Sequence, residues 1–405
     1  MRDGETGRVK TRRVFYIPGY DPIPARRYRE LYRTEGAAQA AISGYRLAMH
    51  GLHEKGRFGW SVTAAMDGAE VATDIEVLGW SDIVQGSMAQ GIAATYGQLA
   101  RTVWTYIGSG AFFRLIGLRK GPVLVALYPL AMLIVQLLTS CLAGWAVAAV
   151  LGLWLPFALA GLAGLAVVPL GLSLWKRQDG RLFAHYLMHD YAFTAAGGGE
   201  NPPELEARMA EFGKRIGAAL TAEVDEVLVV GHSSGAHLAV SVLADLLRAG
   251  ARPRAGGPVL SFLSLGQVVP MASFLPRAWR LRADLAYLSQ SDAVTWVDVS
   301  APGDCACFSL CDPVAVSGVA PEAKRWPLVL SAAFSQTLSP AKWKAMRWRF
   351  FRLHFQYLCA FDRPGDYDYF RITAGPLTLA ARFGGRAPSA SRIERSASPH
   401  RSLAA

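Results

Sequence analysis

A long uncharged stretch places the strongest limit on how this chain of 405 residues can fold. From Gly121 to Trp175 no residue carries a charge, and most side chains are apolar. A helix needs about 20 apolar residues to cross a bilayer, so the stretch holds two such helices and a connection, whereas one tilted helix would leave too much over. We therefore predict a transmembrane helical hairpin with its turn within residues 143–155. The alternative is a pair of helices buried in the core of a large soluble protein.

Basic residues flank this stretch on both sides: Arg114, Arg119 and Lys120 before it, and Lys176, Arg177 and Arg181 after it. Segments rich in Lys and Arg stay on the cytoplasmic side of a membrane, so both ends of the hairpin are expected to face the cytoplasm. We therefore expect a multi-pass protein of the inner or plasma membrane with its catalytic domain in the cytoplasm. An apolar fraction of 52% agrees with a membrane segment.

Outside the hairpin, apolar runs alternate with stretches of helical character. The runs that predict strands are 14–17, 75–80, 226–230, 258–266, 294–300 and 326–334. Asp67-Gly68, between two alternating runs, predicts a β-hairpin, and residues 25–50 have helical character. Strands that alternate with helices form a mostly parallel sheet with helices on both faces, so the predicted fold class is α/β.

The predicted hairpin interrupts this α/β domain. We predict residues 1–115 as the N-terminal part of the domain, 116–178 as the transmembrane hairpin and 179–375 as the C-terminal part. Residues 376–405 are rich in Ser, Ala, Arg and Pro, which predicts a disordered basic tail.

The chain carries a formal net charge of +11, and its basic clusters bracket the apolar stretch. Such clusters bind anionic lipid or nucleic acid, but no nucleic-acid-binding module is recognisable, so membrane lipids are the expected partner and no nucleic acid is expected. The five cysteines are too sparse for a disulfide framework. Cys305, Cys307 and Cys311 lack a CxxC spacing and a nearby histidine, so no metal and no cofactor is expected.

The segment Gly231-His232-Ser233-Ser234-Gly235 follows an apolar strand and precedes a run of small residues. Only Ser233 has a glycine two residues away on each side, which gives it the central place in the G-x-S-x-G pattern. Such a turn lifts the serine oxygen above the sheet edge, at the start of a helix whose free N–H groups favour an oxyanion. Ser233 is therefore the candidate nucleophile. The alternative is an ordinary strand–helix turn with solvent-exposed serines.

This strand–serine–helix context resembles the α/β-hydrolase superfamily, the group of esterases and lipases. The resemblance implies an α/β-hydrolase-like sheet and the chain order Ser, then Asp or Glu, then His. Of the eight histidines, only His354 and His400 follow a suitable acid, and His400 lies in the predicted tail. His354 is therefore the candidate base. Residues 341–358 have helical spacing, so the alternatives are a histidine packed inside a helix and a helix on the membrane surface.

The loop after the strand at 294–300 is where the resemblance places the acid. Asp304 comes four residues after this strand and is the favoured candidate, because a carboxylate just past a strand end can reach the histidine and fix its tautomer. Asp312 is the runner-up, with a helix cap or a turn as its alternative role. Asp298 lies inside the strand, where its reach is poor.

The oxyanion hole that the resemblance implies needs two backbone N–H donors. One is the N–H of Ser234, and the other comes from the loop after the first strand, where Gly19 or Tyr20 is the candidate. Residues beside such a serine generally point away from it, so His232 and His237 are expected to be bystanders.

Together these residues predict a membrane-anchored serine hydrolase. Ser233 would attack an ester, His354 would take its proton, Asp304 would orient the imidazole, and water would release the acyl-enzyme. A site held near the bilayer favours a hydrophobic ester or a lipid-like small molecule as the substrate. The same triad also serves acyltransferases and thioesterases. A second class remains open: a non-catalytic membrane-anchored binding or scaffold protein with this fold.

Overall fold

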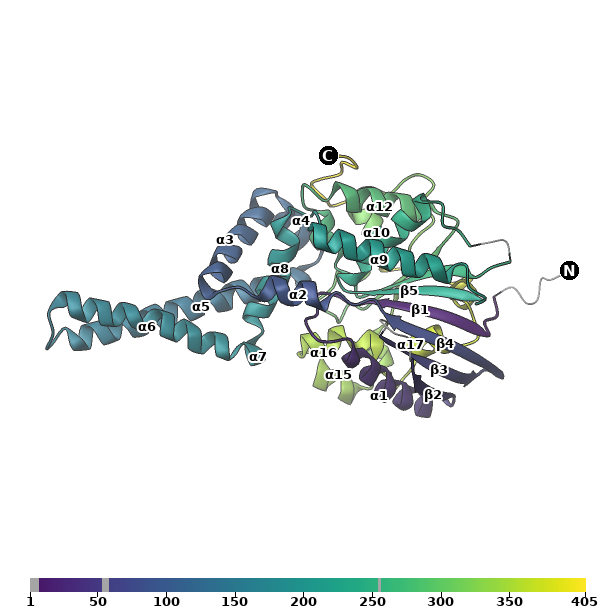
Figure 1. Ribbon diagram of the computed structural model, residues 1–405, viewed down its shortest axis with the longest axis horizontal. Helices are drawn as coiled ribbons and strands as arrows, with labels where there is room; N and C mark the ends of the chain where they lie inside the picture. The colour runs from purple at the N-terminus through teal and green to yellow at the C-terminus, as the bar shows by residue number, and fades with distance from the viewer. Residues whose placement is uncertain (1–6, 53–57, 254–255) are drawn as a thin grey trace.

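An eight-stranded sheet forms the centre of the protein, and a two-helix arm projects from one side of it (Figure 1). The computed structural model describes residues 7–52, 58–253 and 256–405. The strand order is β2-β3-β4-β1-β5-β6-β7-β8, with antiparallel pairing from β2 to β4 and parallel pairing from β4 to β8. The α/β prediction with a mostly parallel sheet is therefore confirmed. The strands are β1 (Thr11–Ile17), β2 (Arg46–Gly51), β3 (Gly59–Met66), β4 (Ala69–Val77), β5 (Glu226–His232), β6 (Val259–Leu265), β7 (Thr295–Ser300) and β8 (Leu328–Ser331).

Side chains alternate from strand β1 into two hydrophobic cores, one on each face of the sheet. Val14 and Tyr16 enter the core covered by α1 and the C-terminal helices α15 to α18. Phe15 and Ile17 enter the opposite core, covered by α9, α10 and α12. The helices of these layers are α1 (Arg26–Ser43), α9 (Pro203–Ala219), α10 (Gly235–Arg248), α12 (Trp279–Gln290), α15 (Pro340–Met346), α16 (Phe350–His354), α17 (Tyr369–Ala374) and α18 (Leu379–Phe383).

Further helices connect the sheet to the arm or fill its loops. Residues 81–118, which precede the uncharged stretch, form three helices that end in a cluster with the first turns of the arm. The remaining elements are α2 (Ser81–Met88), α3 (Ile92–Gly108), α4 (Ala111–Leu118), α7 (Asp179–Leu182), α8 (Ala184–Ala196), α11 (Val269–Ser273), α13 (Pro313–Val316), α14 (Phe334–Thr337) and the 3₁₀ helix η1 (Gln356–Leu358).

The predicted β-hairpin forms at Asp67-Gly68. Asp67 has φ 52° and Gly68 has φ 75°, and positive φ at both central residues is what a type I′ turn requires. The second strand of this hairpin, β4, also pairs with β1, so it joins the main sheet. The prediction of helical character through residue 50 is wrong, because Arg46–Gly51 forms the edge strand β2. Its pairing with β3, a tertiary contact, overrides the local helical pattern.

Residues 376–405, predicted to be a disordered tail, instead lie along the domain in the structure. The segment contains α18, and Ile393 forms a bridge with Cys311. The N–H groups of Ala397 and Ser398 donate to the carbonyl of Val316. The tail is held by backbone groups of loops that are distant in sequence, so its composition could not predict this ordered path.

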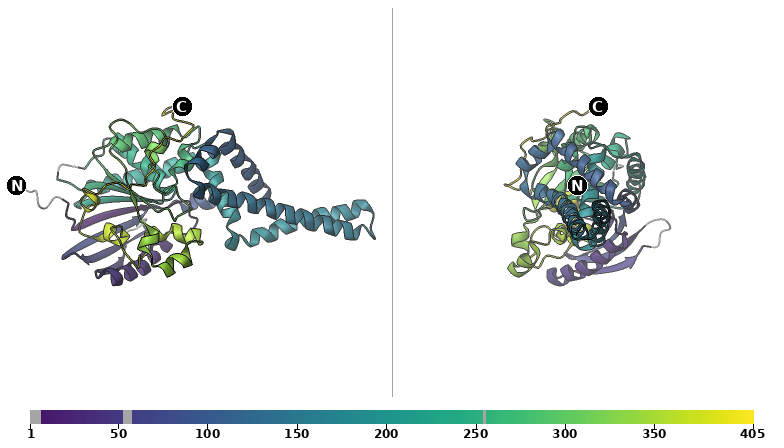
Figure 2. Two further views of the ribbon diagram at one scale, coloured as in Figure 1. Left: turned by 180° about the vertical axis from the view of Figure 1, so that it is seen from behind. Right: turned by 90° about the vertical axis from the view of Figure 1, so that its left-hand side faces the viewer.

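Two apolar helices, α5 (Lys120–Leu151) and α6 (Phe157–Arg177), form the arm (Figures 1 and 2). Both are long enough and apolar enough to cross a membrane. The connection falls at residues 152–156, at the late end of the predicted interval. The first turns of α5 pack into the domain, where Val123 and Leu133 are buried, and only the later turns project.

Small residues form the contact between the two arm helices. A Cβ atom on Gly144 would lie 2.5 Å from the carbonyl oxygen of Gly164, and one on Gly171 would lie 2.7 Å from Ser140 Oγ. Close approach through Gly and Ser is typical of helix pairs in membranes. Large apolar side chains point away from the contact and are exposed, among them Leu138, Leu142, Trp145, Phe157, Leu162, Leu165 and Leu170. A helix pair buried in a soluble core would place its large side chains inside.

Candidate active site

Ser233 occupies a strained turn between β5 and α10. Its φ of 58° lies in the left-handed region, which is uncommon for a residue with a side chain. Its N–H donates to the carbonyl of Leu265, at the end of the neighbouring strand β6, over 2.9 Å. This is the strand–turn–helix context that the G-x-S-x-G pattern predicts, and strain of this kind often marks a functional residue.

The two glycines of the pattern are required by close backbone contacts. A Cβ on Gly231 would lie 2.7 Å from Ala236 Cα, and one on Gly235 would lie 2.2 Å from the carbonyl oxygen of Ile17. Both separations are shorter than carbon atoms tolerate, so the strand, the turn and the helix reach these positions only with glycine. The close approach holds Ser233 at the carboxyl end of β5.

His354 and Asp304 form a hydrogen-bonded pair. His354 Nδ1 lies 2.7 Å from Asp304 Oδ2, which also accepts a hydrogen bond from the Tyr357 hydroxyl over 3.0 Å. The backbone N–H of Ala306 donates to the other carboxylate oxygen over 2.9 Å. Burial by itself raises the pKa of Asp304, but His354, the Ala306 N–H and the Cys307 thiol outweigh burial and hold that pKa below its ordinary value. The carboxylate is therefore an ionised acceptor that orients the imidazole.

The imidazole of His354 lies close to the serine turn. A Cβ on Gly266 would lie 3.2 Å from His354 Cε1, and Gly266 directly follows Leu265, whose carbonyl binds the Ser233 N–H. Both Ser233 and His354 line the same cavity. Within the described residues, the structure gives no hydrogen bond between Ser233 Oγ and His354 Nε2. Serine–histidine bonds are often long without substrate and shorten when it binds.

The continuous helix predicted for residues 341–358 is wrong. The segment is broken into α15, α16 and η1, so His354 is the last residue of a short helix and not the middle of a long one. Of the apolar residues that recur at helical spacing in this segment, Met346, Leu353 and Tyr357 enter the core, whereas Phe350 remains 38% exposed. The breaks at residues 347–349 turn the chain so that the aromatic side chains of this segment face two directions.

Asp312, the runner-up acid, has another role. Its carboxylate accepts hydrogen bonds from the N–H groups of Val314 and Ala315 at the start of α13, and it forms an ion pair with Lys324 at 2.6 Å. Asp298 accepts a hydrogen bond from Ser264 inside the sheet. Asp312 is therefore a helix cap, which was its alternative role.

His232 and His237 also line the cavity that contains Ser233 and His354, and each has other contacts. His232 Nε2 donates to the backbone carbonyl of His354 over 3.0 Å, and burial together with the charge of His354 lowers the pKa of His232 to about 3. A neutral His232 thus helps to hold the backbone of the candidate base, a contact that the sequence did not reveal.

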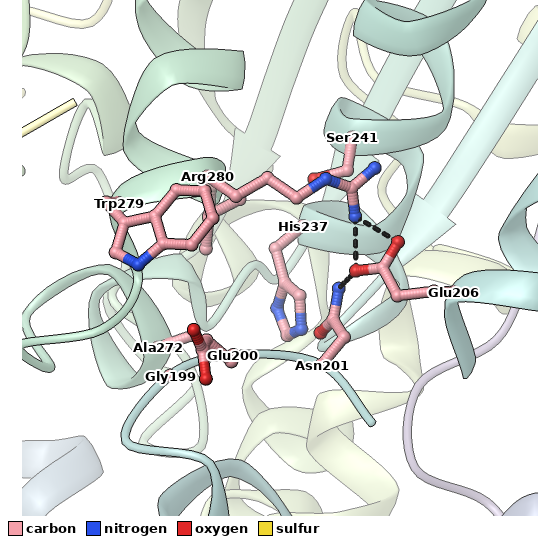
Figure 3. Close-up of a pocket in the computed structure, with 10 residues that line it drawn as sticks. Gly199, Glu200, Asn201, Glu206, His237, Ser241, Ala272, Trp279 and Arg280 are labelled. Carbon is pink, nitrogen blue, oxygen red and sulfur yellow. Dashed lines mark hydrogen bonds and ion pairs between the residues drawn. The ribbon is translucent and has the colours of Figure 1, made fainter. Parts of the chain in front are cut away.

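His237 projects toward a small polar cavity of about 170 Å³ (Figure 3). Asn201 and the ion pair of Glu206 with Arg280 surround it there. Burial lowers the pKa of His237 to about 4. The remaining downstream histidine, His400, lies within hydrogen-bond distance of the carbonyl of Ser109. Neither histidine is paired with an acid in the way that His354 is.

The candidate oxyanion donors lie around the serine turn, and one of them is already hydrogen-bonded. The Ser234 N–H, at the start of α10, has no hydrogen-bond partner in the part of the chain that the structure describes. Gly19 approaches closely, since a Cβ there would lie 3.3 Å from Ser233 Oγ. The N–H of Tyr20 donates to Ser234 Oγ over 2.8 Å, so it points toward the turn but is already occupied.

A large cavity of about 890 Å³ leads to Ser233 and His354. Its wall contains Asp190 from α8, which no sequence pattern singles out. Burial raises the pKa of Asp190 to about 7, and its carboxylate has no hydrogen-bond or ion-pair partner within residues 7–52, 58–253 and 256–405. A single Asp in a largely buried helix carries no signal in sequence. Only the packing of α8 against α3 and α5 places it in the cavity.

No group of three or more His, Cys, Asp or Glu side chains in the described segments is arranged to hold a metal ion. Comparisons with protein-family models, with curated protein sequences and with solved structures found no match. The geometry of the site is therefore the basis for a functional assignment.

Proposed function

We propose that this protein is a membrane-anchored serine hydrolase that cleaves ester-type substrates through Ser233, His354 and Asp304. The observation that carries the proposal is that a strained serine and the histidine of a buried Asp–His pair line one cavity. The three residues come from the carboxyl ends of β5, β7 and the segment after β8. This chain order and these places around a parallel sheet support an α/β-hydrolase-like fold.

In the proposed reaction, Ser233 Oγ attacks the ester carbonyl carbon and its proton moves to His354 Nε2. The ionised Asp304 holds the other ring nitrogen and stabilises the imidazolium that forms. The Ser234 N–H donates to the developing oxyanion, and the Gly19 N–H is the candidate second donor, because the Tyr20 N–H already donates to Ser234 Oγ. The alcohol leaves with the proton of His354, and water then attacks the acyl-enzyme with His354 as the base.

We also propose that α5 and α6 anchor the protein in a membrane. Support comes from their length, their outward-facing apolar side chains and their small-residue contact. Basic residues lie at both ends of the arm where it joins the domain: Arg119 and Lys120 before α5, and Lys176, Arg177 and Arg181 at and after the end of α6. Their charge favours a cytoplasmic location for the domain. The protein is expected to stay with the membrane pellet after carbonate extraction. Release into the supernatant would contradict the anchor.

A fluorophosphonate probe tests the catalytic proposal, because it reacts with activated serines. The wild-type protein in detergent is expected to be labelled, and Ser233→Ala is expected to lose all labelling. Ser234→Ala, which keeps its backbone N–H, is the matched control and should still be labelled. A folded wild-type protein that takes no label would favour the alternative, a non-catalytic binding or scaffold protein.

A further inference from the structure

The segment Arg347–Arg352 alternates basic and aromatic residues and lies exposed between two buried positions. Trp348 is 72% exposed, and Phe350 and Phe351 are each 38% exposed. Arg347, Arg349 and Arg352 are exposed, and within the described residues none of the three has an ion-pair partner. Exposed aromatic residues among unpaired arginines are unusual on a surface that faces only water.

This segment lies beside the root of the arm. The ring of Phe351 is 4.9 Å from that of Phe183 and 6.0 Å from that of Tyr186. Phe183 follows α7, which continues directly from the end of α6. Figure 1 shows α16 and α7 on the side of the domain from which the arm projects. If the arm crosses a bilayer, the segment lies near the level of its headgroups.

Aromatic residues of this segment also form the opening of the large cavity. Trp348, Phe350 and Phe351 line it together with Phe183 and with Leu124 of α5. All five are exposed large apolar side chains, so they mark where the cavity meets the surface, and we call them the mouth residues. Ser233 and the buried His354 line the same cavity. The route from the surface to the serine therefore begins among apolar groups at the root of the arm.

We propose that the mouth residues and the surrounding arginines dock on the surface of an anionic bilayer, so that the acyl chain of the substrate enters the cavity from the membrane. Aromatic residues with Lys and Arg are the composition that binds at such an interface. Basic residues at the arm root, Arg177 and Arg181, extend the positive surface. The substrate class is then an ester with a long acyl chain carried by the bilayer. This proposal rests on the proposed serine hydrolase function.

Depth-dependent quenching tests the docking without using activity. A fluorescent dye is attached to Arg347→Cys in a Cys141→Ser background, since Cys141 is an exposed free thiol. The full chain is reconstituted in vesicles that contain brominated lipid, with either neutral or anionic headgroups. Arg252→Cys is the matched control, because this exposed site precedes β6 at the amino ends of the strands, whereas Ser233 lies at the carboxyl ends.

We expect the dye at position 347 to be quenched at least twofold more strongly than the dye at 252, with stronger quenching in anionic vesicles. Equal, weak quenching at both positions would overturn the docking, and equal quenching in neutral and anionic vesicles would overturn the role of charge. A charge-reversing variant, Lys344→Glu with Arg347→Glu, lies outside the cavity. It should lower the turnover of a vesicle-borne long-chain ester about tenfold while a soluble short-chain ester is turned over as before.

The two proposals fail in different ways. Absence of fluorophosphonate labelling would remove the hydrolase, whatever the dye reports. Labelling of Ser233 together with an unquenched dye at position 347 would keep the hydrolase and remove the membrane entry. Unchanged turnover of the vesicle-borne long-chain ester in the charge-reversed variant would also overturn the docking.

Discussion

His354 Nδ1 lies 2.7 Å from Oδ2 of Asp304, a residue 50 positions earlier in the chain. The carboxylate holds the imidazole in the tautomer whose Nε2 can accept a proton from serine. Asp304→Asn keeps the shape but offers the ring a neutral partner, so we expect kcat to fall by about 10⁴-fold. Steady-state hydrolysis of a soluble ester measures this effect.

Asp312→Asn is the matched control for this substitution. Asn keeps an oxygen that can cap α13 but loses the charge that pairs with Lys324, so the substitution should lower the free energy of unfolding by about 1–2 kcal/mol and leave the reaction in place. Similar kcat values for the two variants would contradict the assignment of Asp304 as the acid.

Gly19 leaves the space in front of the nucleophile open. A Cβ at this position would lie 2.9 Å from Ser233 Cβ and 3.3 Å from Ser233 Oγ, so Gly19→Ala must displace one of the two segments. We expect at least about a tenfold loss of kcat/KM, because small displacements of reacting groups are costly. Gly79→Ala meets no atom within 4 Å and serves as the control. Unimpaired turnover in Gly19→Ala would show that the loop does not form part of the oxyanion site.

Asp190 makes stability depend on pH in a defined window. Burial raises its pKa to about 7, so the folded protein binds a proton there that the unfolded chain has already lost above about pH 4. The contribution of this group to stability is therefore full below about pH 4 and is lost as the pH rises to about 7.

Asp190→Asn cannot titrate, so its unfolding free energy relative to wild type should rise by about 2–4 kcal/mol between pH 4 and pH 7 and then stay constant. Chemical denaturation of the detergent-solubilised protein across this range measures the difference. A difference that does not change with pH would show that Asp190 ionises as it does in water.

Gly144 sets the distance between the two arm helices. A Cβ atom on residue 144 would lie only 2.5 Å from the carbonyl oxygen of Gly164. Gly144→Leu should therefore push α5 away from α6. Gly161→Leu, on the same arm, meets nothing within 4 Å and should keep the pair together. Disulfide cross-linking between Ser140→Cys and Gly171→Cys in each background reports the separation. Equal cross-linking in both would mean that the small residues do not hold the pair.

Several features of the protein depend on local chemistry, and the sequence alone was enough to predict them. The uncharged stretch Gly121–Trp175 predicted two long apolar helices, and the alternation around Asp67-Gly68 predicted a β-hairpin. The need for glycine on both sides of Ser233 could also be predicted, because a tight strand–helix turn leaves no room for side chains there. The chain order that the α/β-hydrolase resemblance implies selected His354 as the candidate base, and closeness to the strand end ranked Asp304 above Asp312 as the candidate acid.

Other features were decided only by the tertiary structure. The edge strand β2, the ordered tail and the placement of Asp190 in the cavity depend on partners far away in the chain. So do the break in the helix before His354 and the bond from Tyr20 to Ser234. Backbone sterics and the spacing of apolar residues depend on a few neighbouring positions, so these features can be predicted from sequence patterns. Which side chain meets which across the sheet depends on how the whole chain packs.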